Sequence, residues 1–413
     1  MKIKNCLLAF FIFFPFISCN TQNKVEDSKG KLVIDMDKAK MNPDSIFTAS
    51  MLFKGIKLIP LETNESCLIG SITKITVFEQ FIFVMDHVVA KSLYVFDKEG
   101  RFIRKIGSVG SGPGEYVEIR DFTIDRVNKT VYLYDGRLQR INIYDLATGK
   151  FIRYVSLERN TSNVTSNGHI EHIGGKLYSD AAFREHTVKN FLLFTIDELS
   201  GKENNNFLNV IEYNKGISNT NANRNPYVPF YMRENGDAIF VQPFMNHLIE
   251  ITNDGVFSYI EFKGKNFLTS DEAKRTNELF NYKSTAEVRN INKYTRLVSY
   301  FEKGDRILID MAKGMQLHRI LIHKKTKEVT IFERGRDDLL YSEDKNPGKM
   351  PSYGCFDANG VYFYTGSFSS NGVTEFQSFA RSGALSPSII GLDNLMKLDE
   401  EDNPILFYYE FKE

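Results

Sequence analysis

The chain has 413 residues, and its 52 lysines and arginines are balanced by 52 aspartates and glutamates. Because this balance leaves no net field to attract a polyanion, we expect no nucleic-acid partner. The hydrophobic fraction of 42% and the 34 phenylalanines supply enough apolar side chains for a large core. Length alone suggests two or three domains, but repeat folds exceed that prior, so one closed domain is allowed.

The first residues are typical of an export signal. Lys2 and Lys4 give a positive start, and the apolar run from Leu7 to Ile17 is too short to span a membrane. Cys19 follows at once, in a sequence that resembles a bacterial lipobox. We therefore predict a lipoprotein signal peptide at residues 1–19 with Cys19 as the lipidated residue, which would anchor the protein in a membrane. A plain secretory signal is the alternative.

Six short strands recur along the rest of the chain, each entered through a turn and several ending in Asp. They repeat at intervals of roughly 45 to 70 residues, which is typical of a propeller blade of four strands with its loops. Val131–Tyr134 is apolar on both faces, as expected where stacked blades bury both sides of a sheet. The six strands are Phe81–Asp86, Thr130–Asp135, Lys176–Asp180, Asp237–Gln242, Asp305–Asp310 and Val361–Gly366.

The repeats predict an all-β fold, a six-bladed β-propeller of four-stranded antiparallel blades. The last blade is one strand short, whereas Gly55–Pro60 near the N-terminus has no blade of its own. Pairing this segment with the C-terminal strand would close the ring and remove its exposed edges. We assign residues 31–413 to the propeller and residues 20–30, which are polar, to a flexible tether.

Two segments interrupt the strand pattern. Asn204–Asn225 is rich in asparagine and predicts a long solvated loop. Thr269–Glu272 combines hydroxyl caps with acids, which predicts the start of one short inserted helix at about residues 271–288. Outside the leader the chain has only Cys67 and Cys355, for which we favour two free thiols over a disulfide, because a bridge needs Cα atoms within about 7 Å.

The segment between the first two blades carries a blade-linker signature. Its glycines let the chain turn from the outer edge of one blade to the inner strand of the next, and its proline stiffens that crossing. The signature residues are Gly110, Gly112, Pro113, Gly114, Glu115 and Tyr116.

With the strands that follow it, this segment resembles an NHL-type propeller repeat. The lipobox, the Ile59–Thr63 entry and the Asp402–Leu406 exit are similar to the six-bladed β-propeller lipoproteins of anaerobic Gram-negative bacteria. The resemblance implies an outer-membrane lipoprotein of the cell envelope without an established activity.

The sequence contains no convincing catalytic or cofactor motif. The glycine segment is not a phosphate loop, because Pro113 occupies the position where that loop needs lysine. His169 and His172 flank Glu171, but strand alternation directs His172 to the opposite face, which argues against a metal site. We expect no catalytic residue, metal or cofactor. Some related propellers act as metal-dependent lactonases or as lyases, so a hydrolase or lyase with a metal or polar site in the central channel is the alternative.

Residues that lead into the inner strands tend to form the rim of a propeller channel. We predict a monomer that uses this face to hold a peptide, a glycan or an envelope protein without catalysis. For each charged residue alone, a solvated loop or an ion pair between blades is the alternative. The candidate binding residues are Lys74, Arg120, Asp121, Glu171, Tyr227 and Tyr353.

Overall fold

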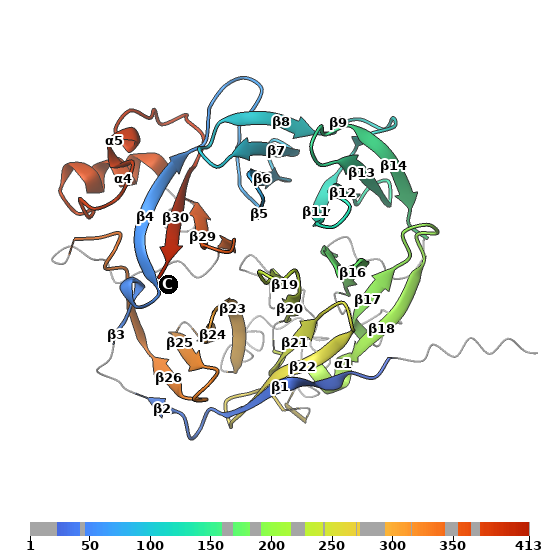
Figure 1. The fold of residues 1–413 in the computed structure, drawn as a ribbon, viewed down its shortest axis with the longest axis vertical. Coiled ribbons are helices and arrows are strands. Elements are labelled where there is room, and N and C mark those ends of the chain that lie inside the picture. The colour runs from blue at the N-terminus through green and yellow to red at the C-terminus, as the bar shows by residue number, and fades with distance from the viewer. Residues whose placement is uncertain are drawn as a thin grey trace, which may run out of the picture.

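The computed structural model describes residues 23–41, 46–158, 168–181, 191–215, 228–242, 244–269, 271–272, 294–314, 316–342, 354–364 and 372–412. These residues form six mainly antiparallel blades of four strands in a ring (Figure 1). The first strand of each blade lies nearest the centre, and later strands lie further out. The prediction of a six-bladed all-β propeller is confirmed.

The first three blades each contain four consecutive strands. Blade 1 consists of β5 (Lys74–Phe78), β6 (Phe81–Asp86), β7 (Ser92–Asp97) and β8 (Phe102–Ile106). Blade 2 consists of β11 (Ile119–Asp125), β12 (Thr130–Asp135), β13 (Arg140–Asp145) and β14 (Phe151–Ser156). Blade 3 consists of β15 (Ile170–Ile173), β16 (Lys176–Asp180), β17 (Phe191–Ile196) and β18 (Glu203–Asn209).

The last three blades complete the ring. Blade 4 consists of β19 (Phe230–Met232), β20 (Ala238–Phe240), β21 (His247–Ile251) and β22 (Val256–Lys263). Blade 5 consists of β23 (Thr295–Lys303), β24 (Arg306–Lys313), β25 (Gln316–His323) and β26 (Val329–Phe332). Blade 6 combines β28 (Cys355–Phe356), β29 (Gly360–Tyr364) and β30 (Ile405–Phe411) with β4 (Phe53–Pro60). Because β4 pairs antiparallel to β30, the predicted closure is confirmed.

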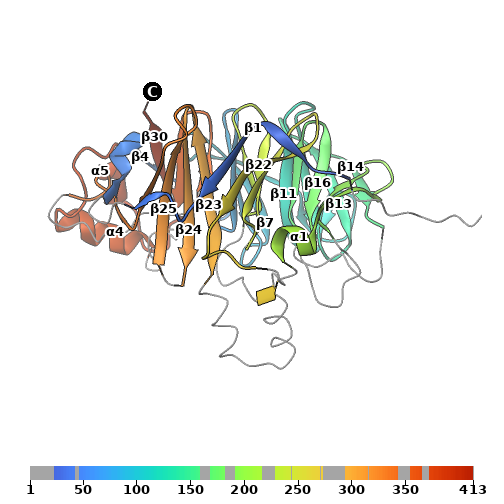
Figure 2. The same cartoon turned by 90° about the horizontal axis from the view of Figure 1, so that it is seen from below.

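Residues 23–41 and 46–52 lie along the outside of the ring, and together with β4 we call them the N-terminal belt. β1 (Glu26–Asp35) pairs in parallel with β22, and β2 (Lys40–Met41) pairs in parallel with β26. β3 (Ile46–Thr48) pairs with β27 (Arg334–Arg336), and the short 3₁₀ turn η1 (Ala49–Met51) leads into β4. Figure 2 shows β1 lying across the outer side of the ring.

The belt corrects the predicted tether. β1 begins at Glu26, so the prediction of a flexible segment over residues 20–30 is wrong from Glu26 onward. Backbone groups hold this strand against the free edge of β22, an interaction that a hydrophobic pattern does not reveal. Residues 1–22, including the predicted signal peptide and Cys19, lie outside the described residues.

Short helices lie on the outside of the blades. α1 (Val210–Asn214) follows β18 directly, so the prediction of a loop over Asn204–Asn225 is wrong as far as Asn214. The Asn209 side chain caps α1 by accepting hydrogen bonds from the backbone of Ile211 and Glu212. The buried Leu208 and Tyr213 anchor this turn, a signal that the surrounding asparagines obscured.

Two further helices, α4 (Gly372–Arg381) and α5 (Leu392–Leu395), are inserted between β29 and β30. Of the helix predicted at residues 271–288, only residues 271–272 are described. Thr269 and Glu272 form the reciprocal hydrogen bonds of a capping box there, as the predicted helix start requires. Within the described ranges, no helix is both long enough and apolar enough to cross a membrane.

The core lies between neighbouring blades. On β12, Val131 and Leu133 belong to a cluster with the apolar residues of blade 1, whereas Tyr132 and Tyr134 pack against blade 3. Both faces of this strand are therefore buried, as its sequence predicted.

The blade-linker signature joins β8 to β11 through the small parallel pair of β9 (Ser108–Val109) and β10 (Glu115–Tyr116). The Glu115 carboxylate accepts a hydrogen bond of 2.8 Å from the backbone of Gly112, and Gly114 has a φ of 75°. Glycine is required at residue 114 because a side chain there would also collide with Phe151.

Candidate functional site

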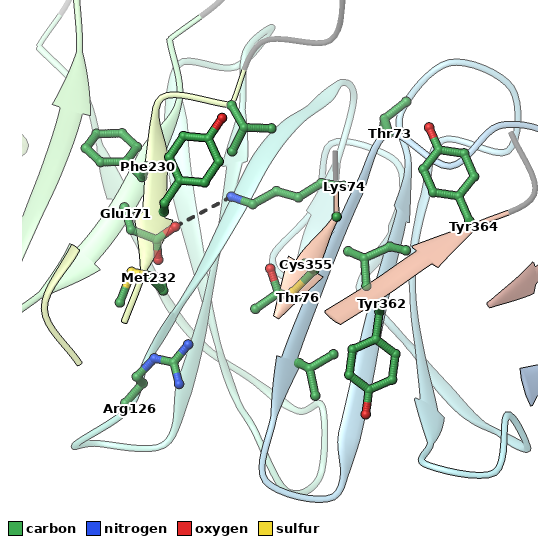
Figure 3. A pocket seen from close by; sticks show the side chains of 15 residues that line it. Thr73, Lys74, Thr76, Arg126, Glu171, Phe230, Met232, Cys355, Tyr362 and Tyr364 are labelled. Carbon is green, nitrogen blue, oxygen red and sulfur yellow. Dashed lines mark ion pairs between the residues drawn. The ribbon is translucent and has the colours of Figure 1, made fainter. Parts of the chain in front are cut away.

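A cavity of about 120 Å³ lies at the centre of the ring. Its wall comes from the inner strands of blades 1, 3, 4 and 6 and from the β11–β12 turn of blade 2, and most of this wall is apolar. Figure 3 shows the polar side chains Lys74, Arg126, Glu171 and Tyr364 around the space, with Met232 beside Glu171.

Lys74 connects three blades at the axis. From β5, its ammonium donates a hydrogen bond of 2.8 Å to the Asp121 carboxylate on β11 and one of 2.7 Å to the backbone carbonyl of Phe122. The Glu171 carboxylate on β15 lies 3.8 Å from the same nitrogen, an ion pair drawn as a dashed line in Figure 3. We call Lys74, Asp121 and Glu171 the axial triad.

The two carboxylates of the triad are also bound by hydrogen-bond donors of the protein. Asp121 is only 1% exposed, and it accepts backbone hydrogen bonds of 2.8 Å from Phe122 and 2.9 Å from Ile170. Glu171 accepts a hydrogen bond from the Thr123 hydroxyl. Asp121 therefore joins blade 2 to the blades on either side, and its oxygens have little capacity left for a ligand.

Burial and neighbouring charges have opposite effects on the pKa values of Lys74 and Glu171. Burial alone would lower the pKa of Lys74, but the carboxylates of Asp121 and Glu171 outweigh it and raise that pKa above its ordinary value. Burial raises the pKa of Glu171, although Lys74 and the Thr123 hydroxyl offset part of this effect. Lys74 thus stays positively charged, and Glu171 gains a proton more readily than an exposed glutamate.

Arg126 also lines the cavity and has a different environment. It lies in the turn after β11, with its guanidinium 5.0 Å from the centre of the Phe78 ring. In the part of the chain that the structure describes, the Arg126 side chain forms no hydrogen bond and no ion pair, and neither does that of Tyr364. Burial raises the pKa of Tyr364, so its hydroxyl remains a neutral donor. The cavity therefore offers donors that the fold itself does not use.

The structure brings three of the six predicted binding residues together, namely Lys74, Asp121 and Glu171. Arg120, which was predicted for the same rim, does not line this cavity. A β-bulge at Arg120 re-aims its side chain, which pairs with Glu118 at 2.7 Å and packs over Gly136. Tyr227 and Tyr353 lie outside the described residues.

Arg126, Met232 and Tyr364 were not predicted. The predicted binding residues lie at or near the entries of the inner strands, whereas Arg126 follows the exit of β11 and Tyr364 ends β29. The missed signal was a charged residue directly after the strand aspartate Asp125.

The histidines near Glu171 do not converge on a common point. His169 lies 3.3 Å from Asp180, and His172 lies 3.1 Å from Glu198, while Glu171 faces Lys74. Among the described residues, no group of three or more His, Cys, Asp and Glu side chains could hold a metal ion.

Both cysteines outside the leader, Cys67 and Cys355, are free thiols. Cys355 lines the cavity, and burial raises its pKa to about 11, so the thiol stays protonated at neutral pH. This placement makes Cys355 a reporter of cavity occupancy.

Comparison with known proteins assigns the chain to a family. The model of the family described as "Domain of unknown function (DUF4934)" matches residues 31–410. The chain belongs to this family. The match extends from β1 to β30, so every residue of the cavity lies within the DUF4934 domain. No curated protein matches the chain.

Two solved structures share the fold of this DUF4934 protein. One is a protein of Bacteroides fragilis assigned as exported, with a TM-score of 0.67 and 16% identity, covering 92% of this chain and 100% of that chain. The other is a member of the DUF4221 family from Bacteroides vulgatus, with a TM-score of 0.50 and 12% identity, covering 87% of this chain and 97% of that chain. At these identities the likeness shows the fold alone.

Proposed function

We propose that this protein is an exported lipoprotein whose propeller binds a ligand in the central cavity without catalysis. The observation that carries the proposal is the cavity itself, a mostly apolar space at the ring centre into which Arg126 presents donors that the fold does not use. Such a space, with few convergent polar groups, is typical of a ligand site. The ligand is a small molecule or a group that projects from a peptide, glycan or protein.

The environment of the carboxylates favours binding over catalysis. Asp121 is held by Lys74 and by two backbone donors, and Glu171 by Thr123 and Lys74. The rival function is a hydrolase or lyase in which Glu171 transfers a proton, and the raised pKa of Glu171 is the observation in its favour. That rival requires turnover of a lactone or ester that Glu171→Gln abolishes.

Cavity occupancy can be tested with Cys355. The mature protein is incubated with a panel of peptides, sugars and small organic acids, and the rate of alkylation of Cys355 and the thermal unfolding temperature are measured. A bound compound should slow alkylation and raise Tm. Thr76→Tyr, which places a ring in the cavity, should abolish both effects, whereas Thr326→Tyr in the exposed β25–β26 turn should not. A compound that raises Tm equally in Thr76→Tyr would contradict the proposal.

The anchor at Cys19 also has a structural consequence. The backbone of Asn23 donates a hydrogen bond of 2.8 Å to Asn206 on β18, and its side chain donates one of 3.0 Å to Asn205. Only four residue steps separate Cys19 from Asn23, a reach of at most about 14 Å. A lipid on Cys19 would therefore hold the outer edge of blade 3 close to the membrane.

Membrane fractionation tests the anchor. The exported relative from Bacteroides fragilis supports an envelope location. Cys19→Ala should move the protein from the membrane fraction to the soluble envelope fraction. Persistent membrane association of this variant would show that the lipid is not the anchor.

A further inference from the structure

We infer that the cavity takes a carboxylate on an apolar body, and that Arg126 binds this carboxylate. The inference rests on the proposed function of the cavity as a ligand site, and it specifies the chemical class of the ligand. The acid is either a free small molecule or the end of a longer chain.

Among the described residues that line or adjoin the cavity, Arg126 is the cation left available to a ligand. Lys74 uses two of its donors on Asp121 and Phe122 and faces Glu171 with the third. Arg126 has no hydrogen-bond or ion-pair partner within the described residues. A guanidinium is always charged and carries five donors, so a half-buried guanidinium beside an apolar wall favours an anionic partner.

The adjacent carboxylate, Asp125, does not serve this purpose. Its oxygens accept hydrogen bonds from the backbone of Val127 and Asn128 and from the Asn128 side chain, at 2.7 to 3.0 Å. It also lies 3.5 Å from the His172 ring. Asp125 is therefore directed into its own turn and toward blade 3, while the ring of Phe78 supports Arg126.

The chemistry of the site selects a carboxylate among anions. The planar guanidinium matches the two oxygens of a carboxylate with parallel hydrogen bonds. A single unpaired cation balances a monoanion, whereas a phosphate dianion would bring a second charge into a mostly apolar space at a large cost. Glu171 does not compete strongly with the ligand for Arg126, because its carboxylate already interacts with the Lys74 ammonium and the Thr123 hydroxyl.

The size and the wall of the cavity define the rest of the ligand. An apolar cavity of about 150 Å³ holds benzene, so about 120 Å³ suits a body of roughly five or six heavy atoms. Val77, Phe230 and Met232 supply aliphatic and aromatic contacts for it. A branched aliphatic acid, or a peptide that ends in an apolar residue, satisfies both requirements.

Matched acids and amides test the charge directly. Binding of isovalerate and isovaleramide to the mature protein is measured by NMR, together with N-acetyl-leucine and N-acetyl-leucinamide. The affinity of each acid should be at least about 10-fold higher than that of its amide, as expected for a hydrogen bond to a charged group. Tighter binding of isovalerate would identify a free small acid, and tighter binding of N-acetyl-leucine a chain end.

Two arginine variants test whether Arg126 causes the difference in affinity between acids and amides. Arg126→Gln should reduce the affinity for the acids to that for the amides, while Arg137→Gln, exposed in the β12–β13 turn of the same blade, should leave it unchanged. Thermal unfolding confirms that each variant is folded. Equal binding of acids and amides, unchanged affinity in Arg126→Gln, or no binding of any acid would overturn the inference.

The failure of this inference can be told apart from the failure of the proposed function. If a probe binds in the cavity, is lost in Thr76→Tyr and is insensitive to Arg126→Gln, the binding function stands and the carboxylate inference is wrong. If the acids bind to Thr76→Tyr as to the wild type, the cavity is not the site and both proposals are wrong.

Discussion

Blades 1–3 and blades 4–6 are joined in different ways. The first three meet at the axis, where the axial triad links their inner strands through charged hydrogen bonds. The last three are joined along the outer edge of the ring, where the N-terminal belt pairs with β22, β26, β27 and β30 in turn. Charged groups thus join the inner strands in the first half, while the second half gains backbone pairing on its outer side in addition to the 2.7 Å ion pair between Arg233 of blade 4 and Glu302 of blade 5.

This difference between the two halves indicates where charged side chains can gather in the fold. A belt needs only a free strand edge and a few apolar side chains, and Leu32, Ile34 and Phe47 are buried along it. An axial junction needs ionised groups inside the ring, and these groups border the cavity. The half of the propeller that is tied at its axis therefore also supplies most of the polar lining of the proposed site.

The largest expected effect is at the axial triad. Asp121→Ala leaves the partly buried Lys74 beside a single carboxylate and removes the acceptor of the Ile170 backbone, so we expect a loss of about 3 to 5 kcal/mol in the free energy of unfolding. Urea denaturation of the mature protein measures it. The exposed Glu99→Ala should change stability by less than about 1 kcal/mol. An equally small effect at Asp121 would show that the triad does not hold the blades together.

The second largest change in the free energy of unfolding is expected at the N-terminal belt. Ile34 is 6% exposed and packs into the core between blades 4 and 5, so Ile34→Ala should cost about 2 to 4 kcal/mol. Its neighbour Val33 is 54% exposed, and Val33→Ala should stay within about 0.5 kcal/mol. The same denaturation experiment compares them. If both variants unfold like the wild type, the belt does not contribute to the stability of the ring.

The smallest effect concerns pH at the junction of blades 5 and 6. Asp337 is buried, and although it accepts a hydrogen bond of 2.6 Å from Tyr409, burial raises its pKa to about 6. Because the folded pKa exceeds the ordinary value of 3.8, the contribution of Asp337 is fully present only below that value, and it is lost as the pH rises from there through about 6. That loss is roughly 2 to 3 kcal/mol.

The variant Asp337→Asn isolates this contribution, because the amide oxygen can still accept from Tyr409 and does not ionise. Its stability relative to the wild type should rise between pH 4 and pH 7, as measured by urea denaturation at each pH. A constant difference over that range would mean that Asp337 does not titrate there.

The sequence predicted the blades far better than the connections between them. β6, β12 and β16 have their predicted bounds, because turn residues and two apolar faces mark a stacked strand. The belt escaped prediction because parallel pairing to a sheet edge uses backbone groups, which any sequence carries. Ring closure by β4 was predictable only because the last blade lacked a strand.

The candidate site was predicted in part. Lys74, Asp121 and Glu171 were found because they enter or occupy inner strands, but their mutual contact depends on how three blades pack. Arg120 does not line the cavity, because a one-residue bulge, which cannot be read from the sequence, re-aims its side chain. Arg126 was missed because its environment depends on Phe78 in another blade.

A crystal structure of the protein isolated from its native cells would show directly whether the cavity is a ligand site. We expect a bound ligand in the central cavity, in contact with Arg126 and packed against Met232. A native ligand bound elsewhere on the propeller, with only water between Arg126 and Met232, would contradict this expectation.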